Sequence, residues 1–413
     1  MKAWLQRFRE AHTPSEWEWR GAPTQPLTLS ACPRRPLASP APAHRSSAKR
    51  RAIRSCVCAS ALLLPLYANA SEPKFDHLLK LTPENSAIGN FPAQKKAVLT
   101  IKSGETVKLE TGGGNRWAEQ SPEVWLKENG IVPTEEEQRA IGEIDRVVKE
   151  TTRYAGIQNG HLLVGPVAIE GAMPGDTLEV RILSVVPRIP YGSVGMRPGR
   201  GGIPDSVPEA YTKIVKLDLK RNVGLFEPGI EVPLGPFMGV MGTLPPDSDG
   251  PNRRSGPPGV FGGNLDCKEL VAGTTLYLPV YHPGGLFYTG DSHAAQGDGE
   301  VTVNAIETAN TAILQFIVHK GKTLKAPRAE TPTHYIAFGL DEDLDKAMQM
   351  AIHETNAYLA DAQGLDFNRA FALSSIAIDF RVTQVVDDTK GIHSMIPKSL
   401  FTKGTPPYWA KNK

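Results

Sequence analysis

Short strand-like runs separated by turn residues fill the middle of this chain and limit its fold more than any other feature. Between residues 160 and 236, β-branched and aliphatic residues form runs of three to seven residues. Such runs, bounded by glycine and proline, are typical of β-strands. We expect strands at residues 162–164, 167–169, 177–183 and 214–219, two more within 96–110 joined by a Ser103-Gly104 turn, and others at 275–280 and 300–307.

Helical patterns flank this β-rich region. The acidic segment 121–153 has a helix start at Pro133-Thr134-Glu135, and apolar residues then follow at helical spacing. This segment is expected to pack over the first sheet. Late in the chain, helices are expected at 341–359 and 366–373, before an alternating strand at 376–382. The predicted fold is mainly β with added α+β: a β-sandwich or jelly-roll-like part joined to a smaller α+β part.

The first seventy residues differ in kind from the rest. They hold 11 Lys/Arg against 3 Glu, so residues 71–413 carry 35 basic and 41 acidic residues, a net charge of about −6. A basic face for nucleic acid is therefore not expected. Lys49-Arg50-Arg51, an apolar run at 56–67 and Ala68-Asn69-Ala70 are typical of a secretory signal, so we expect cleavage after Ala70 and an exported, periplasmic or secreted protein.

The apolar run is shorter than the ~20 residues that span a bilayer, so no membrane partner is expected after cleavage. Residues 1–47 are either a disordered leader or upstream sequence translated from a misassigned start. The mature chain keeps one cysteine, Cys267, which excludes an intramolecular disulfide. We expect it to be a buried, inert thiol.

Residues 290–300 crowd acids, a histidine and an amide between glycines. Asp291 and His293 are two residues apart, as are Asp298 and Glu300, so on extended backbone each pair leaves one face. Such a cluster suits a metal or an acid/base site. The alternative is an ordinary Asp/Gly turn. The strand expected at 300–307 favours the functional interpretation. Two long stretches, 191–202 and 244–263, are expected to be irregular, and the second is also expected to line the site.

Four ordered motifs resemble the acetamidase/formamidase family. They are Gly165-Pro166 with Glu170-Gly171-Ala172-Met173-Pro174-Gly175-Asp176, Gly239-Val240-Met241-Gly242 with Gly262-Gly263-Asn264-Leu265-Asp266, Gly290-Asp291-Ser292-His293 with Gln296-Gly297-Asp298-Gly299-Glu300, and the late Gly339-Leu340-Asp341 and Gln384-Val385-Val386-Asp387. The resemblance covers about residues 95–400. It implies a β-sandwich with a smaller α+β portion, hydrolysis of short linear amides to a carboxylate and ammonia, and a bound divalent ion, with Zn²⁺ expected and Ca²⁺ the alternative.

The resemblance also gives the candidate residues roles. Asp291 and His293 are expected metal ligands, with Asp266 or His161 as the third, because catalytic zinc takes three protein ligands and keeps an open position. Glu300 is the expected general acid/base. Asp298 is either a further ligand or a neighbour that raises the proton affinity of Glu300. The amides of Gln296 and Asn264 are candidate donors to the substrate carbonyl or its oxyanion.

Three parts are expected: a leader at 1–70, a β-rich catalytic domain at 71–330 and an α+β part at 331–413 packed on it. The expected partner is a small amide, and the expected assembly is a homo-oligomer. Hydrolysis of cyclic amides and a non-catalytic, Ca²⁺-binding β-sandwich module remain alternatives. No Gly-x-Ser-x-Gly elbow, phosphate loop or dinucleotide fingerprint occurs, which argues against a serine hydrolase and against nucleotide cofactors.

Overall fold

The computed structural model describes residues 72–114 and 120–403. These residues belong to one compact unit, and the leader and signal-peptide predictions at 1–70 lie outside the described residues. Among the described residues, no helix is long and apolar enough to cross a membrane.

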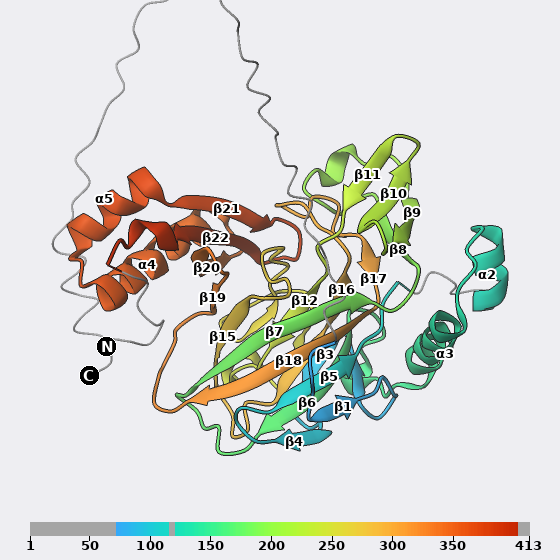
Figure 1. Cartoon of the computed structure of the whole chain (residues 1–413), viewed down its shortest axis with the longest axis horizontal. Coiled ribbons are helices and arrows are strands. Elements are labelled where there is room, and N and C mark those ends of the chain that lie inside the picture. Colours follow the sequence, from blue (N-terminus) through green and yellow to red (C-terminus); the bar gives the residue numbers. More distant parts are fainter. Residues whose placement is uncertain (1–71, 115–119, 404–413) are drawn as a thin grey trace, which may run out of the picture. The chain divides into compact units, whose positions relative to one another are not determined.

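Two large sheets make up most of the described chain (Figure 1). Within it, the first has nine strands in the order β1 (His77–Leu79), β5 (Thr106–Glu110), β18 (Asn310–His319), β7 (Thr177–Pro187), β15 (Thr275–Pro279), β19 (Arg328–Glu330), β20 (His334–Asp341), β22 (Lys390–Pro397) and β21 (Asp379–Gln384). The strands after residue 330 therefore extend the same sheet as the earlier ones.

The second sheet runs in the order β11 (Ile230–Pro233), β10 (Val223–Glu227), β9 (Tyr211–Asp218), β8 (Tyr191–Met196), β17 (Glu307–Thr308), β16 (Phe287–His293), β12 (Phe237–Gly242) and β14 (Gly262–Asn264). Strand β6 (Leu162–Ile169) pairs with β16 and carries β2 (Ser86–Ile88) and β4 (Leu99–Ile101). A small ribbon pairs β3 (Asn90–Pro92) with β13 (Asn252–Arg254).

The largest core cluster lies where the two sheets meet. It joins Val180 and Phe316 of the first sheet to Val164 and Phe287 of the second. The rings of Phe287 and Phe316 pack edge to face with centroids 5.0 Å apart, a favourable aromatic geometry. This sandwich of two packed sheets, with few helices, confirms the mainly β prediction.

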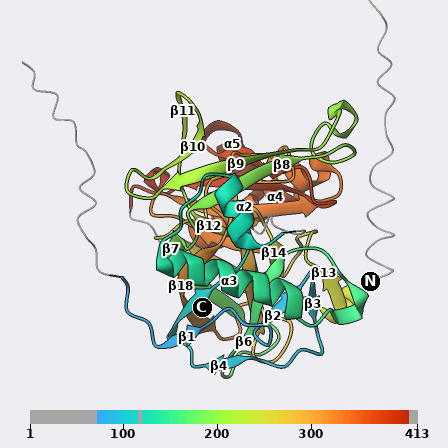
Figure 2. The ribbon, with the colours of Figure 1, turned by 90° about the vertical axis from the view of Figure 1, so that its right-hand side faces the viewer.

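Helices cover two opposite sides of the unit (Figures 1 and 2). On one side are α2 (Pro122–Glu128) and α3 (Glu135–Glu150), and on the other α4 (Leu344–Gln363) and α5 (Phe367–Ala377). Single 3₁₀ turns occur at Tyr154–Gly156, Pro204–Ser206, Asp247–Asp249 and Lys398–Leu400. Helix α3 begins after Thr134, which forms a capping box with Glu137, and it buries Ile141, Ile144 and Val147 in the main core. The apolar face of this helix therefore packs on the main core.

Several local predictions were wrong. Residues 162–169 form one strand instead of two, and residues 191–196 form β8 where an irregular stretch was expected. Ile376 lies in α5 and is 82% exposed, and the strand predicted at 376–382 begins only at Asp379, as β21. The predicted strand at 300–307 is mostly turn, with only Glu307–Thr308 in β17. Glu300 and Val303 have positive φ values of 43° and 72°, which lie in the left-handed region and not in the extended region.

Candidate active site

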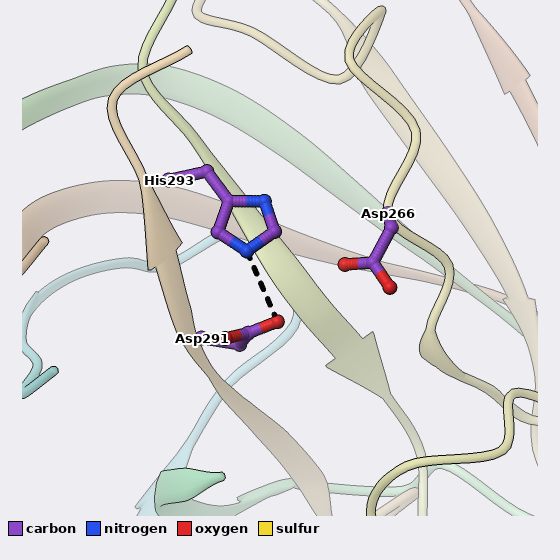
Figure 3. A group of neighbouring side chains, drawn as sticks. All are labelled: Asp266, Asp291 and His293. Carbon is purple, nitrogen blue, oxygen red and sulfur yellow. Dashed lines mark ion pairs between the residues drawn. The ribbon is translucent and has the colours of Figure 1, made fainter. Parts of the chain in front are cut away.

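Strand β16 brings Asp291 and His293 together. His293 Nε2 lies 3.2 Å from Asp291 Oδ2 (Figure 3), and the imidazole is fully buried. Asp291 has a φ of 53°, so the pair does not meet by the simple alternation of an extended strand. Asp291 and His293 therefore lie close together as predicted, but only because Asp291 adopts a left-handed backbone conformation inside β16. Phe237 of β12 packs edge to face on the imidazole, with centroids 5.0 Å apart.

Asp266 faces this pair from the loop after β14 (Figure 3). It is fully buried, and neither carboxylate oxygen has a hydrogen-bond partner. Asp266, Asp291 and His293 each offer one ligand atom within 4.8 Å of the others. A buried carboxylate without donors is costly unless something else neutralises it.

Gly239 on β12 makes room for these three side chains. A Cβ atom at this position would lie 2.5 Å from Asp266 Oδ1, 2.6 Å from Asp291 Oδ2 and 3.0 Å from His293 Cε1. Glycine is therefore required here by close approach, since φ is not positive at this residue.

Three more acids complete the cluster. Glu307 Oε1 lies 3.3 Å and Glu300 Oε1 4.0 Å from His293 Nε2. Asp387, which follows β21, groups with Asp266 and Glu300. Glu307 and Asp387 were not among the predicted site residues. Asp387 could have been found from the sequence, because it ends one of the segments that resemble the family. Glu307 appeared in the sequence only as the last residue of the strand wrongly predicted at 300–307.

The electrostatics follow from burial and from close opposite charges. Burial alone would lower the pKa of His293, but Glu307 and Asp291 raise it well above its ordinary value. Burial would raise the pKa of Asp291, but His161 and His293 lower it below its ordinary range. These two side chains therefore form an ion pair, imidazolium with carboxylate, when no other cation is bound.

The pKa values of Asp266, Glu300 and Asp387 are shifted the other way. Burial, together with the charges of Glu300 and Asp291, raises the pKa of Asp266 well above its ordinary value. Burial also raises the pKa of Glu300, and it raises that of Asp387 to about 6. Acids that crowd together in this way resist ionisation, and a bound cation would reverse this effect.

Two predicted amide donors position other site residues. Gln296 Nε2 donates to the Asp266 carbonyl at 2.6 Å, so its Oε1 faces His293 Nδ1 at 3.0 Å. The Nδ1–H of His293 therefore donates to Gln296 Oε1, and its Nε2 faces the acids. This arrangement is usual for metal-binding histidines. Asn264 Nδ2 donates to Asp387 Oδ2 at 2.6 Å.

His161 lies at the edge of the cluster, and Asp298 lies apart from it. His161 Nε2 is 3.9 Å from Asp291 Oδ2. Asp298 forms an ion pair with Lys268 at 2.9 Å and groups with other residues. The turn at 297–300 therefore separates Asp298 from Glu300, because the alternation expected of a strand does not apply there.

A cavity of about 320 Å³ opens onto the cluster. Asp291, Glu300, Glu307 and Asp387 line it, with His161 at its wall. Further lining residues come from 112–114, from α3 and from the segment after it, including Val148, Arg153, Gln158 and Asn159. The stretch 244–263 does not line this cavity, against expectation; Asp249, Arg253 and Val260 instead line a separate cavity of about 660 Å³ beside α4. The stretch packs around Phe261 and Leu244, which draws it away from the site.

The donor set fits a divalent cation. Asp266 Oδ1 and Oδ2, His293 Nε2 and Glu300 Oε2 are buried and have no hydrogen-bond partner. An imidazole with several carboxylates suits zinc or a similar ion better than calcium, because imidazole is a poor calcium ligand. The cluster can therefore hold a metal ion next to a cavity.

Known proteins resemble this chain in sequence and structure. The model of the Acetamidase/Formamidase family matches residues 102–248 and 249–403. The formamidase of Methylophilus methylotrophus is 31% identical over 200 residues, 36% of this chain and 49% of the relative. The acetamidase of Mycolicibacterium smegmatis is 27% identical over 220 residues, 39% of this chain and 54% of the relative. The matched region thus spans about half the length of these curated relatives.

Two crystal structures cover more of the fold. A predicted acetamidase/formamidase from Thermoanaerobacter tengcongensis is 26% identical, with a TM-score of 0.65 over 82% of this chain and 100% of that one. An acetamidase from Bacillus halodurans is 30% identical, with a TM-score of 0.64 over 79% of this chain and 99% of that one. The family model covers most of the residues, so the chain belongs to the Acetamidase/Formamidase family.

Proposed function

We propose that this protein hydrolyses small linear amides, of the formamide and acetamide type, to a carboxylate and ammonia with the help of a divalent metal ion. One observation carries the proposal. Asp266, Asp291, His293 and Glu300 meet in a buried cluster with several unpaired polar atoms, and Asp291 and Glu300 of this cluster line a small cavity. The names of the related proteins support the same reaction.

The metal proposed is Zn²⁺, held by Asp266, Asp291 and His293. These three offer one imidazole and two carboxylates, a set that zinc accepts in catalytic sites. When bound, the ion supplies Lewis acidity that polarises a carbonyl and lowers the pKa of water. His293 is prepared for this role because Gln296 fixes its ring through Nδ1.

Glu300 is the proposed general acid/base. Its Oε2 is buried and unpaired, and burial raises its pKa well above the ordinary value, which increases its affinity for a proton. The carboxylate would take a proton from the attacking water as the new C–O bond forms. It would then pass that proton to the nitrogen as the C–N bond breaks, so that ammonia leaves and the carboxylate product remains.

The cavity favours a small substrate. Its volume of about 320 Å³ is near the lower end for ligand pockets. Asn304 and residues Gly112–Gly114 also line it, and their polar groups are available to orient a carboxamide. A short acyl group fits this space better than an extended chain does.

Ammonia release tests the proposal. The purified protein is assayed with formamide, acetamide, longer linear amides and lactams, before and after metal removal and Zn²⁺ return. We expect turnover of short linear amides that disappears on stripping and returns with zinc. Full activity in stripped protein would refute the metal role, and bound calcium without any ammonia would favour the binding-module alternative.

A variant pair tests Glu300. Glu300→Gln should abolish turnover while zinc stays bound, because Gln cannot shuttle a proton. Glu209→Gln, an exposed glutamate, is the matched control and should leave turnover unchanged. Turnover retained in Glu300→Gln would remove the proposed role.

Export is a separate proposal that rests on the sequence of residues 49–70. N-terminal sequencing of the protein recovered outside the cytoplasm is expected to begin at Ser71. A mature chain that keeps earlier residues would contradict it.

A further inference from the structure

We propose that Glu269, Asp298 and His393 form a second cation site of the zinc class, separate from the candidate active site. Their ligand atoms lie within 4.8 Å of one another. The three residues come from the loop after β14, from the turn at 297–300 and from β22. They share no member with the cluster around His293.

His393 points to a ligand that hydrogen bonds do not supply. The side chain is completely buried. Its Nδ1 lies 2.8 Å from Thr383 Oγ1, whereas Nε2 is buried without a hydrogen-bond partner. A ring fixed through one nitrogen, with the other free among carboxylates, is the usual state of a histidine that binds a metal.

The two carboxylates retain an oxygen each for a metal ion. Arg381 Nη1 contacts Glu269 Oε1 at 2.9 Å, and Lys268 Nζ contacts Asp298 Oδ2 at 2.9 Å. Glu269 Oε2 and Asp298 Oδ1 remain. One imidazole and two carboxylates suit Zn²⁺, with water as the fourth ligand. Asp298 is exposed, which gives an ion access from solvent.

The site would act as a cross-link near the catalytic residues. Glu269 follows Asp266 by three residues, and Asp298 precedes Glu300 by two. The turn already meets the end of β21, because Gly299 N–H donates to Thr383 O at 3.1 Å and Val385 N–H donates to Gly299 O at 3.2 Å. A bound ion would fasten both active-site loops to β22.

Zinc stoichiometry tests this proposal. Metal-stripped protein is dialysed against Zn²⁺, and bound zinc is measured by mass spectrometry. We expect two ions per chain in the wild type, one in Asp298→Asn and one in Asp266→Asn, with none in the double variant. Asp266→Asn reports on the proposed active site and Asp298→Asn on the second site, so failure of one proposal is distinguishable from failure of the other.

Two further variants sharpen the test. His393→Gln should also lose one zinc ion, while His353→Gln, which changes an exposed histidine on α4, should lose none. Lys268→Gln should tighten binding of the second ion, because it removes a positive charge that competes for Asp298. If Asp298→Asn and His393→Gln both bind as much zinc as the wild type, or if Lys268→Gln weakens the second site, the proposal is overturned.

Discussion

Gly239→Ala is a sharp test of the candidate active site. The added methyl would lie 2.5 Å from Asp266 Oδ1 and 2.6 Å from Asp291 Oδ2, where ordinary contacts begin at 3.4 Å. Both oxygens would therefore have to move by about 0.8–0.9 Å. Metal sites tolerate shifts of only about 0.2 Å in ligand distance, so the ligand set should no longer fit one ion.

The expected magnitudes follow from that displacement. A misplacement of about 1 Å costs on the order of 100-fold in rate, and overpacking costs about 1–3 kcal/mol of unfolding free energy. Because the φ of Gly239 is not in the left-handed region, alanine adds no backbone strain, and the fold should survive. We expect turnover to fall at least about 100-fold, with one zinc ion lost.

Ammonia release, zinc content and urea unfolding measure these three quantities on the same preparation. Gly235→Ala is the matched control, because its added methyl meets only Val271 at an ordinary 3.8 Å. If Gly239→Ala keeps wild-type turnover and zinc content, the three side chains do not converge on a shared ion, and the reasoning fails.

Three further predictions concern stability and reactivity. Asp176 accepts hydrogen bonds from Met173 N, Gly321 N and Lys320 Nζ; burial would raise its pKa, but these donors lower it below the ordinary value. Asp176→Asn should lower the unfolding free energy by about 1–3 kcal/mol at pH 7. The wild type should lose this extra stability as pH falls below about 4, because the carboxylate then becomes protonated. Equal urea midpoints of the two proteins at pH 7 would contradict the prediction. Gly142→Ala, in an exposed position of α3 with no atom near the added methyl, should stabilise the protein by about 0.5–1 kcal/mol in thermal unfolding, and a lower Tm would contradict it. Cys267 is buried, and burial raises its thiol pKa, so iodoacetamide should label it only after unfolding; rapid labelling of the folded protein would show that the thiol is accessible.

Local signals predicted the helices and part of the site. The acidic residues after Thr134 cap α3, and Asp366 caps α5, so both starts could be predicted from a few neighbouring residues. Asp291 and His293 could be predicted to lie close because only one residue separates them, although the left-handed φ of Asp291 that lets them meet could not be predicted. These features depend on short-range chemistry alone.

Long-range placement was beyond the sequence pattern. Strands β4 and β5 are joined by the predicted turn, yet one pairs with β6 and the other with β1 and β18 in different sheets. Asp387 reaches the site from the end of β21, 87 residues after Glu300. Residues 300–306 contain β-branched residues typical of strands, but the left-handed Glu300 and Val303 turn the chain there. Composition alone does not show such dihedral angles.

The helical segment beside the cavity separates two tasks within the molecule. Val148 at the end of α3 and Arg153 after it line the cavity, whereas the acids and His293 come from the sheets and their loops. Evolution or design could change these lining residues to admit other molecules and leave the reacting groups in place.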